Sequence, residues 1–296
     1  MMKINKGFTA AAVAFAIWGV FPLYFHPLHQ VSAFQVVAHR VVWSSVFVLV
    51  AMAMRGELSA LRSTLADSGV VRRLAVAAIL LTVNWGVYVW AITNGHIVES
   101  SLGYFINPLV NVLLGVVLLS ERLTRAQWTA VALAAAGVAY LAIVAGGLPW
   151  IALTLAFSFG IYGLIRKVVK VESLPALATE TLLLVPFAVV YLLWCESAGT
   201  GALGHAGSAV IALLIGSGLL TAITLFLFAY GTRRLPYSTV GVLQYIAPTL
   251  QLACGVYAFH EPFERTRAIG FALIWVALLI YVGEGLRLSR KQRRSY

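Results

Sequence analysis

The chain has 296 residues, of which 61% are hydrophobic and only 10% are charged, and its mean hydropathy is +0.92. This composition excludes a soluble globular domain, which needs far more charge to cover its surface. The net charge of +11 could suggest nucleic-acid binding, but the basic residues follow the pattern of a membrane topology instead.

Apolar runs between charge clusters predict ten membrane-spanning helices. A helix needs roughly 20 apolar residues to cross a bilayer, so ten of them would occupy about two thirds of the chain. Only short loops remain, and we expect no sizeable soluble domain. The predicted spans are 8–26, 32–54, 74–94, 99–119 and 127–145, followed by 149–165, 174–194, 208–231, 237–259 and 268–285.

The basic residues predict which side of the membrane each loop faces. Of the 21 Lys and Arg residues, all but Arg40, Arg265 and Arg267 fall in segments on the same side as the N-terminus. Basic residues in short loops mark the cytoplasmic side, so both termini are predicted to be cytoplasmic. The basic tail can also touch anionic lipid, and we expect no nucleic-acid partner.

The two halves of the chain repeat each other at an offset of about 140 residues. The segment Y-F-I-N-P-L-V-N-V-L-L-G, which starts at Tyr104, aligns with Q-Y-I-A-P-T-L-Q-L-A-C-G, which starts at Gln244. Five spans per half is an odd number, so the second half must enter the membrane from the opposite side. We therefore predict an all-α integral membrane protein with two inverted five-helix repeats at 1–146 and 147–286 and a basic cytoplasmic tail at 287–296.

Further pairs of residues are related by the repeat. At an offset of 141, Trp18-Gly19-Val20-Phe21 falls on Phe159-Gly160-Ile161-Tyr162, and at 140 Pro108 meets Pro248. Both prolines are predicted helix kinks, because proline frees a backbone carbonyl. A kink is tolerated in a membrane where the helix faces protein or a wet cavity. Inverted repeats of this kind are typical of transporters with a site near the bilayer midplane, although channels also contain repeats.

Three ionisable side chains are predicted to lie inside spans. Arg40 follows His39 in the second span, and Glu180 holds the position equivalent to Arg40 in the seventh. Charge inside a bilayer costs roughly 2.5–3.5 kcal/mol and usually faces a cavity or a partner. We interpret Arg40 as the group that holds an anionic or polar part of a substrate. His39 and Glu180 are candidates for proton coupling, since imidazole titrates near neutrality. The structural alternatives are an Arg40–Glu180 ion pair that locks the helices, or an Arg40 side chain that snorkels inside the bundle.

The fourth and ninth spans each carry polar residues along one face. Tyr104, Asn107 and Asn111 recur at i, i+3 and i+7, which is one face of a helix, and Gln244 and Gln251 repeat that face. These groups suit a wet, polar cavity. They could equally be hydrogen bonds between helices, which contribute about 0.6–2 kcal/mol each in membranes.

Side chains on other spans complete the predicted cavity. Aromatic rings can stack on flat or cationic substrates, whereas Trp and Tyr near helix ends are more often interface anchors. We predict that the cavity is also lined by Trp43, Asn84, Trp85, Tyr88 and Tyr162.

Several signals are interpreted as structural. Thr124 and Gln127 match a capping box at the start of the fifth span. Glu121 and Glu261, which are related by the repeat, are predicted to anchor helix ends. The sequence contains no G-x-S-x-G, H-E-x-x-H or Walker-type G-K-[ST] motif, so we expect no hydrolytic enzyme, no ATP-driven pump, no cofactor and no metal site.

Segments spread over nearly the whole chain carry a family resemblance. They are A-I-W-G-V-F-P in the first span, A-H-R-V-V-W-S in the second, N-W at 84–85, S-L-G-Y-F-I-N-P-L-V-N-V-L-L-G in the fourth, L-A-F-S-F-G-I-Y-G-L-I-R-K in the sixth, Glu180-Thr181 in the seventh, Q-Y-I-A-P-T-L in the ninth and F-A-L-I-W-V-A-L in the tenth. In these segments the chain resembles EamA-type proteins of the drug/metabolite transporter superfamily, most closely the RarD branch.

The resemblance implies a ten-helix, two-repeat fold in a bacterial-type cytoplasmic membrane. It also implies a secondary transporter, of a kind that usually exports metabolites or drugs. The RarD branch is associated with chloramphenicol sensitivity, which is weak guidance to a natural substrate. The family gives no agreed catalytic residues, so the site residues above rest on the burial of polar groups.

Taken together, the sequence predicts a secondary transporter that moves a small metabolite or drug-like molecule by alternating access. Its partners would be that substrate, the lipid bilayer and, as a candidate, a coupling proton. A passive channel or facilitator is the alternative function. A membrane enzyme is disfavoured by the missing motifs, and a regulatory membrane subunit without transport stays open. Lipid-facing and partner-facing surfaces are both apolar, so the sequence does not specify an oligomeric state.

Overall fold

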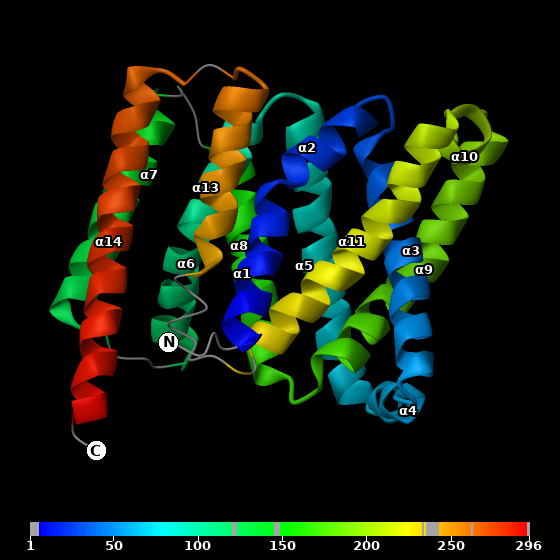
Figure 1. Cartoon of the computed structure of the whole chain (residues 1–296), viewed down its shortest axis with the longest axis horizontal. Coiled ribbons are helices and arrows are strands. Elements are labelled where there is room, and N and C mark those ends of the chain that lie inside the picture. Colours follow the sequence, from blue (N-terminus) through cyan, green and yellow to red (C-terminus); the bar gives the residue numbers. More distant parts are fainter. Residues whose placement is uncertain are drawn as a thin grey trace.

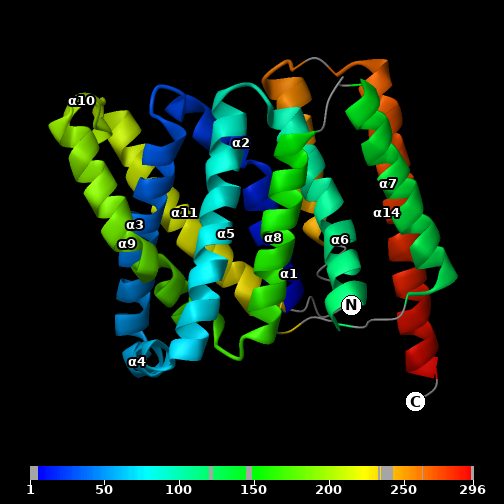
Figure 2. The same cartoon turned by 180° about the vertical axis from the view of Figure 1, so that it is seen from behind.

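The computed structural model describes residues 6–119, 123–144, 149–232, 234, 243–261 and 263–294. Within these ranges the secondary structure is helical, and the helices stand side by side in one bundle (Figures 1 and 2). The prediction of an all-α membrane fold is confirmed.

The first half begins with a bent helix pair. Helix α1 (Lys6–Gly19) turns by 47° into α2 (Phe21–Phe25) and the short 3-10 helix η1 (His26–Leu28). Pro22 at the start of α2 is compatible with this break, because proline fits the first turn of a helix and has no N–H to donate. The remaining helices of this half are α3 (Ala33–Met54), α4 (Leu58–Ala66), α5 (Ser68–Thr93), α6 (Ile97–Leu119) and α7 (Arg125–Val144).

The second half repeats this order of long helices. Its elements are α8 (Trp150–Val168), α9 (Ser173–Ser197), the short α10 (Ala202–His205), α11 (Ser208–Thr232), α13 (Ile246–Ala253), which continues as the π-helix η2 (Cys254–Ala258), and α14 (Arg265–Arg294). Part of the predicted span 237–259 lies outside the described residues. Within the described ranges, five helices, α3, α5, α7, α9 and α11, are by themselves long and apolar enough to cross a bilayer, and the α1–α2 pair makes a sixth. The predicted spans in α8, α13 and α14 correspond to shorter apolar helices.

Local sequence signals fix several helix ends. The Asp67 carboxylate accepts hydrogen bonds from the N–H groups of Gly69 (2.9 Å) and Val70 (3.0 Å) and thereby caps α5. Thr124 and Gln127 form the predicted capping box at α7, with bonds of 2.9 and 3.3 Å. These caps satisfy backbone donors that a helix end would otherwise leave unpaired.

Helices of one half pack against helices of the other half, and these contacts occur in repeat-related pairs. Helix α1 packs on α11, and its counterpart α8 packs on α5, the counterpart of α11. The equivalent pairs α3/α9, α6/α13 and α7/α14 pack directly against each other. Helix α1 runs upward in Figure 1 whereas α8 runs downward, and the start of α1 and the end of α14 lie at the same end of the bundle. The inverted five-helix architecture is thus visible in both packing and direction.

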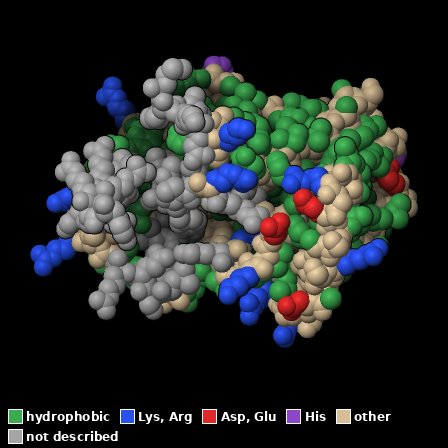
Figure 3. Space-filling model, turned by 60° about the horizontal axis from the view of Figure 1, so that its bottom comes forward, with side chains coloured by type: hydrophobic (Ala, Val, Ile, Leu, Met, Phe, Trp, Pro, Cys, Tyr) green, Lys and Arg blue, Asp and Glu red, His purple; other side chains and the backbone are tan. Residues whose placement is uncertain are grey.

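The surface of the bundle is apolar in a way that suits lipid. Large hydrophobic side chains are widely exposed, among them Phe34, Met54, Phe187 and Leu279. Figure 3, in which the lower end is turned forward, shows hydrophobic side chains gathered over the upper and right part of the described surface and Lys and Arg side chains around this end. A soluble protein rarely exposes so much contiguous apolar surface, and the chain is a multi-pass membrane protein.

Helices α3 and α11 approach closely at Gly218, and we expect Gly218→Ala to destabilise the bundle. An added Cβ would meet the Trp43 side chain and would lie 2.6 Å from the backbone N of Ser44. Overpacking of this kind costs about 1–3 kcal/mol. Thermal unfolding of the purified protein, followed by size-exclusion chromatography, should show a lower midpoint.

Gly163→Ala on α8 is the matched control, because a Cβ there has nothing within 4 Å. Alanine is the better helix former by about 1 kcal/mol, so this variant should be neutral or slightly stabilised. Equal midpoints for Gly218→Ala and the parent would show that α3 and α11 are not held at this distance.

Candidate functional site

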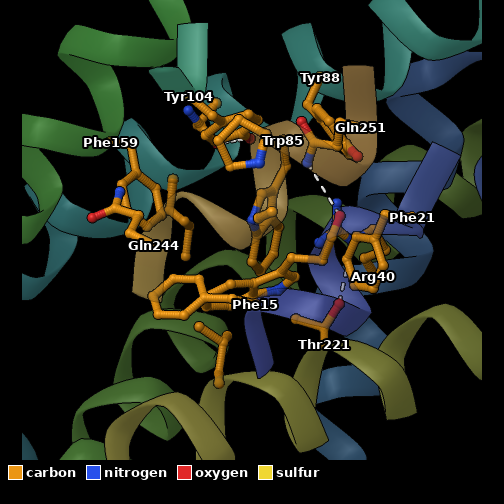
Figure 4. Close-up of a pocket in the computed structure, with 16 residues that line it drawn as sticks. Phe15, Phe21, Arg40, Trp85, Tyr88, Tyr104, Phe159, Thr221, Gln244 and Gln251 are labelled. Carbon is orange, nitrogen blue, oxygen red and sulfur yellow. Dashed lines mark hydrogen bonds between the residues drawn. The ribbon is translucent and has the colours of Figure 1, made fainter. Parts of the chain in front are cut away.

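A cavity lies between the two halves of the bundle. Its volume is about 60 Å³, which is room for a few water molecules. Side chains from α1, α2, α3, α5 and α6 meet side chains from α8, α11 and α13 there (Figure 4). The lining residues are Phe15, Trp18, Phe21, Arg40, Leu81, Asn84, Trp85, Tyr88, Tyr104, Phe159, Thr221, Leu225, Gln244, Ala247, Pro248 and Gln251.

Arg40 is the cationic group of this cavity. Its side chain is 2% exposed, and its Cζ lies 4.2 Å from the ring centroid of Trp85 and 5.0 Å from that of Phe25. Nε donates a hydrogen bond to Oγ1 of Thr221 (3.3 Å), and Nη1 has no hydrogen-bond partner among the described residues. Aromatic faces attract a guanidinium through their quadrupole, so the charge is held by rings rather than by a carboxylate.

Asn84 ties three helices together at the opposite wall. Its Nδ2 donates to the Leu155 carbonyl and to Oγ of Ser158, both at 3.0 Å. Its Oδ1 accepts a hydrogen bond from the Tyr104 hydroxyl at 3.2 Å. These bonds join α5 to α8 and α6, so Asn84 makes interhelical contacts as well as lining the cavity.

Gln251 covers the break between α1 and α2. Its Nε2 donates to the backbone carbonyl of Trp18 at 3.1 Å, close to where the bend interrupts the helical hydrogen bonds. An exposed carbonyl at membrane depth needs such a partner. Oε1 of Gln251 has no partner among the described residues, and Pro248, a predicted kink, lies one turn before it on the same wall.

Aromatic rings form much of the remaining wall. Tyr104 stands edge-to-face to Tyr88, with ring centroids 5.6 Å apart, and to Phe159, at 6.3 Å. Trp18 packs edge-to-face on Phe15 at 5.6 Å. Figure 4 shows Arg40, Phe21 and Thr221 on one side of the cavity, Tyr104, Phe159 and Gln244 on the other, and Trp85 between them.

Glu180 lies outside this cavity, in a separate cluster between α8 and α9. Its Oε1 is 3.5 Å from Nη1 of Arg166, and its Oε2 accepts a hydrogen bond from the Tyr162 hydroxyl at 3.4 Å. Nη2 of Arg166 also donates to the Ser173 carbonyl at 3.3 Å. Within the described chain, therefore, the cation paired with Glu180 is Arg166, and the Arg40–Glu180 ion pair is not formed.

The other predicted site residues are placed apart from the cavity wall. His39, Trp43, Asn107 and Tyr162 are not among the lining residues. Both ring nitrogens of His39 and both side-chain polar atoms of Asn107 are buried without a partner among the described residues. The side chains of Pro108 and Asn111 lie outside the described residues, as does Glu121.

Glu261 agrees with its prediction as a helix-end group. Its two carboxylate oxygens accept hydrogen bonds from the backbone N–H groups of Ile97 and Val98, both at 2.7 Å. This places a negative charge at the N-terminus of α6, where the helix dipole favours it. The bonds also tie the segment after η2 in the second half to α6 in the first.

Sequence reasoning missed several of these groups. Thr221 gave no signal, since a small hydroxyl in a span is common. Arg166 was counted in a cytoplasmic loop because the predicted span ended at 165, whereas α8 continues to Val168. Phe21 and Phe159 were detectable, since both belong to the segments aligned at an offset of 141.

The comparisons with known proteins agree with this architecture. The EamA-like transporter family matches residues 5–143 and again residues 147–283. The chain is 42% identical to "Uncharacterized transporter YojE" of Bacillus subtilis over 98% of both chains. It is 43% identical to "Protein RarD" of Streptomyces exfoliatus over 95% of this chain and 89% of the relative.

A more distant relative and a solved structure extend the likeness. The chain is 31% identical to "Chloramphenicol-sensitive protein RarD" of Pseudomonas aeruginosa over 99% of both chains. A solved structure described as "Crystal structure of protein" superposes with a TM-score of 0.62 at 20% identity, over 95% of this chain and 98% of that one. At this identity the structure shows a shared fold alone.

Proposed function

Because the chain belongs to the EamA-like transporter family, we propose that it is a secondary active transporter that moves a small molecule across the membrane by alternating access. The observation that carries the proposal is the cavity between the two inverted halves, with a buried arginine in its wall. Inverted repeats supply two related conformations around one central site. Its relatives are named as transporters, and we propose no enzymatic role.

Contacts at the upper end of the bundle support a gate there. The His26 ring stacks on Phe259 with centroids 4.4 Å apart, and the Tyr24 hydroxyl donates to the Leu213 carbonyl at 2.7 Å. Together with the bonds from Glu261 to α6, these contacts join elements of the two halves. These contacts must break for the cavity to open at this end, so they would form and break once in each transport cycle.

The direction of insertion is also proposed. The end of the bundle that carries the start of α1 and the end of α14 also carries the basic side chains seen in Figure 3. Basic loops mark the cytoplasmic side. We therefore place both termini in the cytoplasm of a bacterial-type cell, with the protein in its cytoplasmic membrane and the upper gate facing out. Net movement outward, as an exporter, is the direction we propose.

Protons are the proposed coupling ion, with His39 and Glu180 as the candidate groups. Both are buried at membrane depth, with exposures of 1%. Intramembrane ionisable groups often serve as proton relays. The contact between Glu180 and Arg166 gives that carboxylate a structural role as well, and separating the two roles needs a variant of each.

Reconstitution into proteoliposomes tests the proposal. Purified protein is first screened against metabolites and antibiotics by thermal shift, and each stabilising compound is then used in a flux assay with an imposed pH gradient. Secondary active transport predicts accumulation above the equilibrium level, which a protonophore abolishes. Flux that only runs down the gradient of the solute would instead support a passive facilitator. No protein-dependent flux of any stabilising compound would refute transport.

A further inference from the structure

We propose that the cavity selects a small organic anion with a flat, apolar body, whose negative group binds Arg40. This inference rests on the proposed function, because it names the substrate class of the same cavity. Three features of the described residues carry it: an unbalanced positive charge, free hydrogen-bond donors beside that charge, and an aromatic wall facing it.

The positive charge of Arg40 is not balanced by a protein carboxylate in the described chain. The lining residues include no Asp or Glu. The carboxylate that the repeat relates to Arg40, Glu180, is paired with Arg166. Glu196 and Glu261 accept backbone hydrogen bonds at the ends of α10 and α6. A buried charge is costly unless it is paired, so the cavity favours a ligand that brings the missing negative charge.

Hydrogen-bond donors remain available next to this charge. Arg40 uses Nε for Thr221 and one face of its guanidinium for Trp85, which leaves Nη1 without a partner. The Tyr88 hydroxyl is also buried without a partner among the described residues, and Figure 4 shows Tyr88 on the same side of the cavity as Arg40. A carboxylate accepts several such bonds, and charge-assisted bonds of this type are stronger than neutral ones.

The opposite side of the cavity suits an apolar body. Phe15, Tyr104 and Phe159 form that side in Figure 4, and burial of a ring against aromatic side chains is favourable through both area and quadrupole contacts. The cavity volume of about 60 Å³ is below the roughly 150 Å³ that holds benzene in an engineered protein cavity, so we expect the two halves to move apart slightly when a ring enters. A cation would be repelled by Arg40, and a neutral isostere would leave that charge unmatched.

Four probes separate these contributions in a binding assay on the purified full-length protein. Benzoate carries both the charge and the ring, benzamide keeps the ring without the charge, benzylammonium reverses the charge, and acetate keeps the charge without the ring. By isothermal titration we expect benzoate to bind at least about tenfold more tightly than each of the others, which is the size of one charge-assisted contact or one buried ring.

Two substitutions test whether Arg40 is the source of the selectivity for the anion. Arg40→Gln should remove the preference for benzoate over benzamide, because the charge is lost. Arg40→Lys should retain the preference but weaken benzoate binding, because an ammonium lacks the planar fork and the stacking on Trp85. Size-exclusion profiles and thermal midpoints show whether each variant is folded. The comparison of probes on the parent protein needs no variant at all.

The outcomes separate this inference from the transport proposal. Benzamide or benzylammonium binding as tightly as benzoate would overturn anion selection, and so would the absence of benzoate binding to the parent. Acetate binding equal to benzoate would overturn the aromatic part. Selective benzoate binding without flux of any stabilising compound would refute transport and leave the anion site standing, whereas flux of neutral or cationic solutes alone would do the reverse.

Discussion

Arg40→Leu should abolish transport by the reconstituted protein while the variant still inserts and folds. Leucine cannot supply the charge or the donors that Arg40 presents to the cavity, and Thr221 and Trp85 would lose their partner. Insertion should not suffer, because an arginine in a span costs roughly 2.5–3.5 kcal/mol whereas leucine is favourable. The measurement is flux of each solute that the screen identifies, normalised to the protein recovered in the membrane.

Arg265→Gln is the matched control for this variant. Arg265 is exposed at the start of α14, so its loss removes one positive charge without touching the cavity. Flux should stay at the parental level. Normal flux in Arg40→Leu, with the control also normal, would remove Arg40 from the site and with it the proposed anion selectivity.

Glu180→Gln should be the most destabilising of the single substitutions considered. Glu180 is 1% exposed and faces Arg166 at 3.5 Å, so the amide leaves a partly buried guanidinium without its counter-charge. Breaking a fully buried ion pair costs about 3–5 kcal/mol, and because the Arg166 side chain is 19% exposed we expect a loss of about 3 kcal/mol, at the lower end of that range. Tyr162→Phe, which removes only the hydroxyl that donates to Glu180, should cost about 1 kcal/mol. Thermal midpoints of the purified variants give the order.

A double variant separates the structural role of Glu180 from a role in proton coupling. Glu180→Leu combined with Arg166→Met removes both charges, and replacing a buried pair by apolar residues is often neutral or stabilising. The double variant should therefore regain most of the lost stability. If Glu180 also couples transport to protons, the double variant should fold and yet fail to accumulate solute in a pH gradient. Full recovery of coupled transport would make Glu180 purely structural.

The fold was predictable because the constraints of a bilayer leave clear patterns in the sequence of a membrane protein. Long apolar runs give the spans, short basic loops give the sidedness, and the 140-residue repeat gives the inversion. Much of the cavity was predictable for the same reason. Polar groups are rare in spans, and the facial spacing on α5, α6 and α13 brings Asn84, Tyr88, Tyr104 and Gln251 to one region.

The Arg40–Glu180 alternative failed for a reason that the inversion itself contains. Each residue lies seven positions after the start of its helix, Ala33 for α3 and Ser173 for α9. These two helices run in opposite directions, so each charge lies about 10 Å from a different end of the bundle. Repeat-related residues are thus set at mirrored depths, and alignment between halves does not imply contact.

Side-chain partners from loops and helix ends were harder to predict. The contact of Arg166 could not be predicted without knowing that α8 continues past its apolar stretch. Long basic side chains make such a helix end hard to locate from sequence, because they reach back along the helix. Asn107 was predicted from its spacing along one helix face, Trp43 from its helical spacing to Arg40, and His39 as an ionisable group inside a span. Their direction is set by the rotation of each helix, which one sequence pattern does not fix.

The environments of Arg40 and Glu180 differ in kind although the repeat relates them. At the offset of 141, Arg166 falls on Phe25 and Tyr162 on Phe21, so rings surround the charge in one half and an ion pair neutralises it in the other. A faithful duplicate would have inward-open and outward-open forms of equal energy. In this chain the two halves differ, so the two forms should differ in energy and the empty carrier should rest predominantly in one of them. A bound anion would shift the populations of the two forms by the difference in its affinity for them.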